Sequence, residues 1–277
     1  MKGWRRLFTR RPLAAAGLVA MAGVVALSVA GPALPGLNPQ TMNIARRLHP
    51  PAPGLWLGTD EFGRDILARV VHGTRLSLLV GATVTGFCVA AGGMVGLAAG
   101  YFRRLDNLLM RIMDGFMAFP SVILAIALMA ALGPSVVNVI VALGVTYTPR
   151  MARVVRSSVL VVRELDYTQA AVAIGCGTGR VLFRHVLPNC VSPMTVQATF
   201  TFAYAVLGEA LLSFLGVGVP PYVPSLGTML SAGRVYIQVA PWMTLFPGIM
   251  VFVMVLALNL LGDTLRDALD RRLQKVI

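Results

Sequence analysis

The sequence predicts an all-α integral membrane protein with six transmembrane helices and both termini in the cytoplasm. Of the 277 residues, 57% are hydrophobic and only 13% are charged, whereas soluble domains are about half apolar and a quarter charged. A soluble surface of this size needs more charge than the chain carries. Several uncharged stretches also reach the length of about 20 residues with which a helix crosses the hydrocarbon core of a bilayer.

The N-terminal part of the chain predicts the first helix. Residues 1–11 are basic and are expected in the cytoplasm, and residues 12–31 are expected to cross the membrane. A signal peptide cleaved after Ser28-Val29-Ala30 is the alternative. The apolar stretch of about 18 residues is longer than the apolar region of such a peptide. We therefore expect an uncleaved first transmembrane helix.

Residues 32–75 form the predicted external segment, because prolines at positions 32, 35 and 39 stop the first helix. Apolar residues recur later in this segment at helical spacing and predict an amphipathic helix. Such a helix lies on the membrane surface, docks an external partner or packs over the second transmembrane helix, and the spacing leaves these options open. The residues are Phe62, Ile66, Leu67, Val70 and Val71.

Residues 76–265 are expected to hold the other five transmembrane helices. Gly133-Pro134 divides an uncharged run that is too long for one helix, because proline cannot continue the hydrogen-bond ladder. Glycines and prolines between residues 210 and 233 argue against a long helix there. The five helices are expected in residues 76–102, 115–132 and 135–149, from near Pro193 through Glu209, and within 240–262.

The distribution of basic residues predicts the orientation. With the N-terminus in the cytoplasm, the cytoplasmic segments carry 18 of the 24 Lys and Arg residues. Short cytoplasmic loops are the ones enriched in these residues. The C-terminal tail, residues 266–277, is therefore also expected in the cytoplasm. The basic residues lie in separate clusters between apolar runs, which argues against a nucleic-acid surface.

The predicted cytoplasmic loop at residues 150–190 is long for a connection between neighbouring helices. It contains the small pair Ala170-Ala171 after Gln169, and Gly175, which can end a helix in the left-handed conformation. Pro188 predicts a turn or a new helix start. From composition alone the loop is either a docking site for a cytoplasmic partner or a solvated connection.

The order of these residues resembles the EAA loop of ABC-importer permeases. Gln169-Ala170-Ala171, Gly175 and Leu187-Pro188 have the spacing of that loop, with Gln169 in place of the usual glutamate. Five further segments resemble the C-type permease of dipeptide, oligopeptide and nickel importers. They are Leu57–Asp65, Gly73–Leu78, Ala210–Gly218, Phe246–Gly248 and Asn259–Asp270.

This resemblance implies a function. The chain would be a permease subunit of an ATP-binding-cassette importer in the bacterial cytoplasmic membrane, translocating small peptides. It would pair with a second, homologous permease as a heterodimer. Two cytoplasmic ATPases would bind the loop and use the ATP and Mg²⁺, and an external solute-binding protein would deliver the substrate. The coupling residues carried over from the family are Gln169, Ala170, Ala171, Gly175, Leu187 and Pro188.

The chain itself is expected to be no enzyme and to bind no cofactor or metal. It has no G-x-x-x-x-G-K-[ST] phosphate loop, and its three histidines and three cysteines are scattered. Glu209 and Asn259 are candidates for a pathway or a structural role, and Asp114 is expected to pair with Arg111. A nickel or metal-chelate importer is the alternative function, and a secondary transporter is a more remote one.

Overall fold

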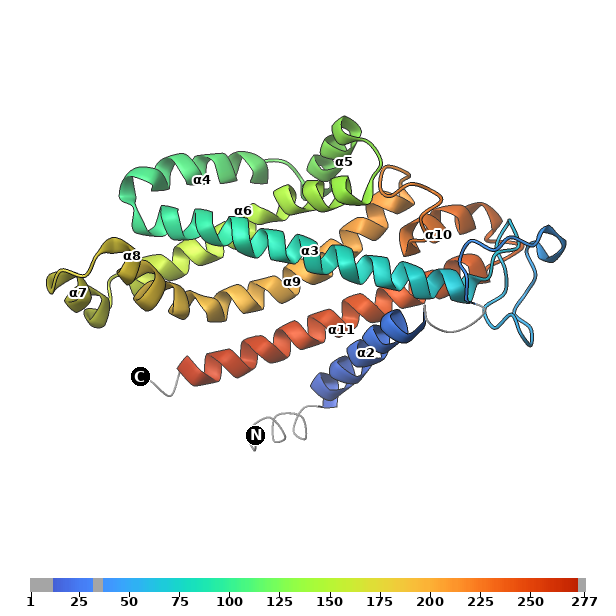
Figure 1. Ribbon diagram of the computed structural model, residues 1–277, viewed down its shortest axis with the longest axis horizontal. Helices are drawn as coiled ribbons and strands as arrows, with labels where there is room; N and C mark the ends of the chain where they lie inside the picture. The colour runs from blue at the N-terminus through green and yellow to red at the C-terminus, as the bar shows by residue number, and fades with distance from the viewer. Residues whose placement is uncertain (1–11, 32–36, 274–277) are drawn as a thin grey trace.

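The computed structural model describes residues 12–31 and 37–273 as a bundle of helices (Figure 1). Regular structure in these residues is helical, apart from two isolated β-bridges. The α-helices are α2 (Pro12–Ala30), α3 (Ile66–Tyr101), α4 (Arg103–Met117), α5 (Ser121–Leu132), α6 (Val136–Val162), α7 (Asp166–Ala173), α8 (Thr178–Val181), α9 (Leu187–Phe214), α10 (Leu226–Gly233) and α11 (Trp242–Leu273). Short 3₁₀ turns lie at Ile44–Arg46 and Arg234–Tyr236, and a π turn lies at Leu182–Val186.

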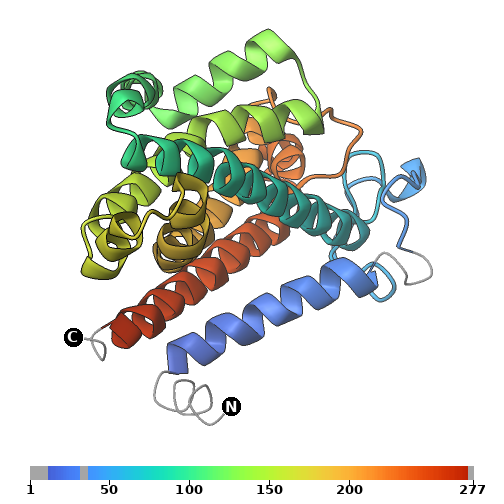
Figure 2. The ribbon, with the colours of Figure 1, turned by 60° about the vertical axis from the view of Figure 1, so that its left-hand side comes forward.

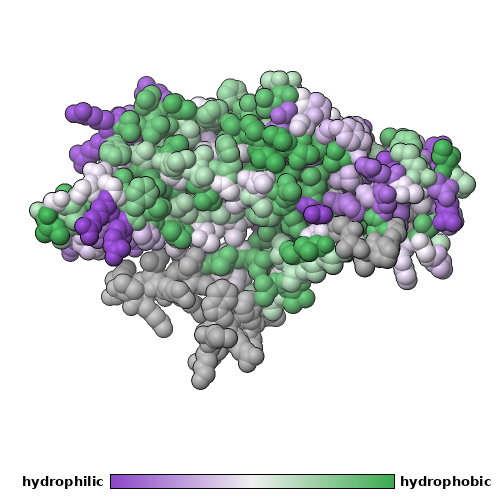
Figure 3. Space-filling model, viewed as in Figure 1, coloured by the Kyte–Doolittle hydropathy of each residue, from purple (hydrophilic) through white to green (hydrophobic). Residues whose placement is uncertain are grey.

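Four long helices, α3, α6, α9 and α11, run along the longest axis of the bundle (Figure 1). Helix α2 lies beside α11 in both views (Figures 1 and 2). Helices α7 and α8 lie at one end of the molecule, and the segment before α3 lies at the other. Helix α2 begins, and helix α11 ends, toward the α7 end. Hydrophobic side chains cover the middle of the visible surface, and hydrophilic ones gather at both ends (Figure 3).

The lengths and hydropathies of the helices fit a membrane protein. Among the described residues, three helical stretches are long and apolar enough to cross a bilayer, at 66–101, 178–214 and 242–267. Helices α4 and α5 make a fourth if the pair, bent by 89°, counts as one span. The apolar part of α2, Ala14–Ala30, is shorter. The all-helical membrane class is thus confirmed, while the count of six and the side on which the termini lie stay predictions.

Helices α3 and α6 pack closely because glycines of α3 face α6. A Cβ atom at Gly92, Gly96 or Gly100 would come within 2.5–2.7 Å of α6 atoms. These glycines follow each other at intervals of four residues, which places them on one face of the helix. Small residues at such an interface let two helix backbones approach closely.

The start of α3 differs from the expected external amphipathic helix. Ile66, Val70 and Val71 belong to the first turns of α3 and are buried, and Phe62 precedes the helix. The Asp65 carboxylate caps the helix by accepting a hydrogen bond from the Leu67 N–H at 2.8 Å. The pKa of this carboxyl is raised by burial. Because apolar side chains of α10 and α11 cover Ile66 and Val70, no separate surface helix forms.

Other helix limits also differ from the sequence expectations. The break at Gly133-Pro134 is present, since α5 ends at Leu132 and α6 begins at Val136. However, α6 continues to Val162, so the first part of the expected loop at 150–190 is helical. Helix α9 begins at Leu187 and passes through Pro193 rather than starting there.

The expected partner of Asp114 was also wrong. Asp114 pairs with Arg153 of α6 at 2.7 Å, rather than with its helix neighbour Arg111. The packing of α4 beside α6 brings these two side chains together. The expected cytoplasmic N-terminus, residues 1–11, lies outside the described residues, as do residues 274–277 of the expected C-terminal tail.

Candidate functional site

The connection between α6 and α9, residues 163–186, forms one end of the molecule (Figure 1). It consists of α7, a turn at Gly175, the short helix α8 and a π turn. Gln169, Ala170 and Ala171 lie on α7, whose buried side carries Thr168 and Ala171. Gln169 and Ala170 are exposed. The Gln169-Ala170-Ala171 part of the EAA-like sequence therefore lies on one short helix, with Gln169 and Ala170 at the surface.

Gly175 ends α7 in the manner that its sequence position predicts. Its φ angle is +82°, and the Gly175 N–H donates to Val172 O at 2.9 Å. The Cys176 N–H donates to Ala171 O at 3.0 Å. These two bonds are the Schellman pattern, which satisfies free carbonyls at a helix end and requires a left-handed residue. A Cβ atom at Gly175 would meet nothing within 4 Å, so glycine is needed for backbone conformation and not for space.

Gln169 ties α7 to the end of α6. Its side-chain amide donates to Arg163 O at 2.8 Å, and the Arg163 guanidinium in turn donates to Gly100 O at the end of α3. A glutamate at position 169 has no N–H with which to make the first bond. The departure from the family pattern at this position thus adds a link between α7 and the transmembrane bundle.

The α6–α9 connection exposes large apolar side chains. Ile174, beside the turn, is 81% exposed and Phe183 in the π turn is 69% exposed. Exposed apolar side chains of this size mark a surface that another protein or the membrane covers. Sequence reasoning missed these residues, although bulky apolar residues in a polar loop were the available signal. The exposed set is Leu165, Tyr167, Val172, Ile174 and Phe183, which we call the apolar patch.

Leu187 and Pro188 start α9 after the π turn. Proline has no N–H and its ring crowds the carbonyl four residues earlier. The preceding turn is widened to a π turn, in which the Leu187 N–H donates to Leu182 O. Helices α8 and α9 thereby run on as one apolar helical stretch from Thr178 to Phe214. The α6–α9 connection is therefore joined directly to a long helix of the bundle.

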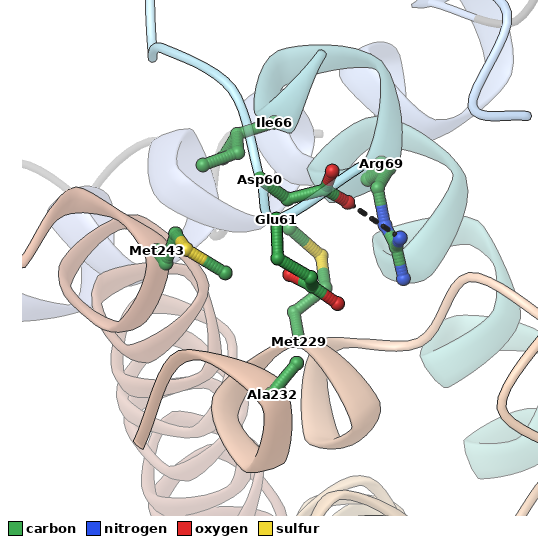
Figure 4. A pocket seen from close by; sticks show the side chains of 7 residues that line it. All are labelled: Asp60, Glu61, Ile66, Arg69, Met229, Ala232 and Met243. Atoms are coloured by element: carbon green, nitrogen blue, oxygen red, sulfur yellow. Dashed lines mark hydrogen bonds and ion pairs between the residues drawn. The ribbon is translucent and has the colours of Figure 1, made fainter. Parts of the chain in front are cut away.

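The opposite end of the molecule carries a buried ionic cluster at the start of α3 (Figure 4). The Asp60 carboxylate accepts hydrogen bonds from the Arg64 side chain at 2.6 Å and the Arg69 side chain at 2.8 Å. It also accepts the backbone N–H groups of Phe62 and Arg64. Glu61 pairs with Arg64 at 3.5 Å. The Leu57–Asp65 sequence thus builds its own compact structure.

A cavity of about 10 Å³ adjoins this cluster. Asp60, Glu61, Arg69 and four apolar residues of α3, α10 and α11 line it (Figure 4). The cavity has room for about one water molecule. Glu61 Oε2 and Arg69 Nε are buried and have no hydrogen-bond partner in the described part of the chain. The site is too small for a transported solute.

Glu209 lies fully buried between helices. Its carboxylate accepts hydrogen bonds from Ser77 of α3 at 2.9 Å and from Ser213 of α9 at 3.0 Å. The Ser213 hydroxyl also accepts the Val219 N–H of the next loop at 3.3 Å. Glu209 therefore links helices in the structure. Asn259 is half-buried in α11, and its side chain makes no hydrogen bond to any described residue.

Comparison with known proteins places these features in a family. Residues 89–275 match the model of the "binding-protein-dependent transport system inner membrane component". A dipeptide transport system permease protein of Alkalihalophilus pseudofirmus is 42% identical over 98% of this chain and 90% of its own length. A di/tripeptide transport system permease protein of Pseudomonas aeruginosa is 46% identical over 79% of this chain and 72% of its own length.

A solved structure agrees with this assignment at the level of the fold. A chain of the inward-facing MetNI methionine ABC transporter matches 73% of this chain and 96% of its own length, with a TM-score of 0.60 and 19% identity. The chain therefore belongs to the family of binding-protein-dependent transport system inner membrane components.

Proposed function

We propose that this chain is the permease subunit of an ATP-driven importer that carries small peptides across the bacterial cytoplasmic membrane. The observation that carries the proposal is the identity of 42–46% to permeases named for dipeptides and for di- and tripeptides. This likeness favours peptides over nickel. The subunit itself catalyses no reaction, and partner ATPases use ATP and Mg²⁺ in this account.

The α6–α9 connection is the proposed contact with an ATPase. The apolar patch would be buried in a cleft of that subunit, with the exposed Gln169 and Ala170 of α7 at its centre and Ala171 packed beneath them. Gly175 fixes the end of α7, and Leu187-Pro188 joins the connection to α9. When the ATPases close on nucleotide, movement of α7 passes to α6 through the Gln169 bond and to α9 through the π turn. This is rigid-body transmission between two states.

The proposed topology has six transmembrane helices with both ends in the cytoplasm. Helices α2, α3, α6, α9 and α11 and the bent pair α4–α5 supply the six. The start of α2 and the end of α11 both point toward the α7 end (Figure 1). The partners in this proposal are a second, homologous permease, two ATPases and an external solute-binding protein.

Uptake by intact cells tests the proposed function. Cells that lack only this chain are compared with cells that regain it, using a labelled dipeptide, a labelled tripeptide and labelled nickel. We expect peptide uptake to fall to background and to be restored by the chain, with nickel uptake unchanged. Loss of nickel uptake alone would contradict the peptide assignment and support the metal importer.

A further inference from the structure

Three arginines follow each other along α6 at intervals of three residues, and they differ in their partners. Arg156 pairs with Asp106 at 2.5 Å and Arg153 pairs with Asp114 at 2.7 Å. Arg150 is exposed and contacts no carboxylate in the described part of the chain. Its guanidinium instead lies 5.4 Å from the centre of the Tyr204 ring of α9. Arg150 is therefore the arginine of this row whose charge has no counter-charge within the described chain.

Arg150 lies at the depth of the apolar part of the bundle. It is 14 residues beyond the start of α6 at Val136, which is about 21 Å along a helix. Its neighbour Met151 packs against Gly92 of α3, where an added Cβ would lie 2.7 Å from the Met151 Cβ. Gly92 is 11 residues before Arg103 in an uncharged stretch, or about 16 Å. In the proposed topology α6 crosses the membrane, and both lengths then place Arg150 within a hydrocarbon layer of about 30 Å, deeper than the cytoplasmic segment to which the count of basic residues assigned it.

The face of α6 that carries Arg150 is unsuited to lipid. Arg150, Arg153, Ser157 and Val161 are the exposed positions of the inner half of α6, and at 100° per residue they fall within one arc of about 80°. A charged side chain in the hydrocarbon layer is costly and usually faces a water-filled path or the interior of a bundle. This face of α6 is therefore assigned to a water-filled path or to the interior of the assembled permease pair, rather than to lipid.

Two tyrosines hold the position of Arg150. The Tyr147 hydroxyl donates to Tyr204 O at 3.3 Å, and the two ring centres are 6.3 Å apart. Tyr204 is 46% exposed, so its ring presents one face to Arg150 and the rest to the open side. A guanidinium that stacks on an aromatic ring keeps its N–H groups free at its edges. These N–H groups have the geometry to bind a carboxylate with two hydrogen bonds.

We propose that Arg150, positioned by Tyr204, binds the C-terminal carboxylate of a peptide as it passes through the permease. This inference rests on the proposed peptide function. Every linear peptide with a free C-terminus carries that carboxylate, whatever its side chains are, so one arginine serves many sequences. A single exposed site also releases its ligand readily, as a transport pathway requires. The same positive charge repels a divalent metal ion.

The test compares one dipeptide in two forms, with a free C-terminal carboxylate and with a C-terminal amide. Uptake is measured for the complete importer with its solute-binding protein, in the wild type and in Arg150→Gln. We expect Arg150→Gln to reduce uptake of the free acid about ten- to a hundredfold, the range of a lost charge-assisted hydrogen bond. Uptake of the amide is expected to change less than threefold. Arg153→Gln is the matched control, since Arg153 already pairs with Asp114, and it is expected to affect both forms equally.

An equal loss of both forms in Arg150→Gln would overturn the inference and assign Arg150 to a carboxylate of another subunit. A wild-type importer that takes up neither form would instead refute the proposed peptide function. The two failures are therefore distinguishable.

A labelling experiment applies if the solute-binding protein rejects the amide. Cys176 is the partly exposed native cysteine, while Cys88 and Cys190 are buried. In a Cys176→Ser background, Arg150→Cys is treated with a membrane-impermeant thiol reagent in inside-out vesicles. We expect labelling that a saturating free-acid dipeptide slows several-fold. Absence of labelling, or labelling that the dipeptide does not slow, would overturn the inference.

Discussion

The two ends of this molecule use their sequence signatures in opposite ways. Before α3, the Leu57–Asp65 sequence makes its contacts within the chain. The Asp60 carboxylate accepts hydrogen bonds from two arginine side chains and from two backbone N–H groups. In the α6–α9 connection, α7 buries only Thr168 and Ala171, and the apolar patch points outward. The first signature therefore maintains the structure of its own segment. The second leaves a surface that another subunit has to cover.

Backbone geometry follows the same division. Gly63 (φ +69°) and Gly175 (φ +82°) are both left-handed. A Cβ atom at Gly63 would lie 1.8 Å from Asn43 O, whereas one at Gly175 would meet nothing within 4 Å. Substitutions in the segment before α3 are thus expected to harm folding, while substitutions in the α6–α9 connection are expected to harm coupling. The predictions below test this division, from the largest expected effect to the smallest.

Loss of Asp60 is expected to have the largest effect. Asp60→Ala removes the carboxylate that pairs with Arg69, which is 5% exposed. Removing one partner of a buried ion pair lowers the free energy of unfolding by about 3–5 kcal/mol. We expect little intact protein in the membrane, and a lower melting temperature of what remains, measured in detergent. Glu164→Ala is the control, because its pair with Arg163 is largely exposed on the Glu164 side. Equal melting temperatures of the two variants would contradict a folding role for the buried ionic cluster at the start of α3.

Gly63→Ala is expected to destabilise the segment before α3 strongly. The new methyl group would overlap the Asn43 carbonyl, and the left-handed conformation itself costs about 1–2 kcal/mol for a residue other than glycine. Gly54→Ala is the matched control, since Gly54 has φ +86° and open space around it. The melting temperature should fall much more for Gly63→Ala than for Gly54→Ala. Similar shifts would show that the contact with Asn43 is unimportant.

Two substitutions at Gly175 distinguish the effect of a strained backbone from the effect of a charge added to the surface. Gly175→Ala is expected to cost only the conformational penalty of about 1–2 kcal/mol, locally. Gly175→Arg adds a large charge beside the apolar patch, and we expect loss of uptake and of ATPase co-purification with unchanged insertion into the membrane. Both quantities are measured on membranes matched for the amount of the permease. Normal uptake and normal co-purification in Gly175→Arg would count against the placement of the coupling contact.

Gln169→Glu is expected to give the smallest effect. The variant loses the hydrogen bond to Arg163 O, which is worth about 1 kcal/mol, and keeps the size of the side chain. Uptake is expected to fall by severalfold at most, with normal membrane levels. Gln169→Ala should resemble it, because it removes the same donor. A fully active Gln169→Ala variant with a tenfold defect in Gln169→Glu would show that the added charge matters more than the lost bond.

Local signals in the sequence predicted local features of the structure. Gly133-Pro134 predicted the break between α5 and α6, and Gly175 predicted the end of α7. Glycines and prolines after Phe214 predicted that no long helix continues there. Each of these features depends on the backbone preference of one or two residues, so the sequence alone contains the necessary information.

Features that depend on distant segments were not predictable in this way. The spacing of Ile66 and Val70 predicted an amphipathic helix but left open what covers it, because the covering residues of α10 and α11 follow more than 150 positions later. Ser77 and Glu209 are separated by 132 positions. Pro193 was expected to begin a helix, yet α9 passes through it. Packing between helices decides these cases, and a single sequence does not show it.

Cross-linking from position 174 tests the central claim most directly. Ile174→Cys and Val235→Cys are made separately in the Cys176→Ser background, since Ile174 and Val235 are both largely exposed but lie at opposite ends of the molecule. The complete importer is treated with a short thiol-to-amine cross-linker. We predict that position 174 joins to an ATPase subunit and that position 235 does not. Cross-linking of the ATPase from position 235, or from neither position, would contradict the proposed role of the α6–α9 connection.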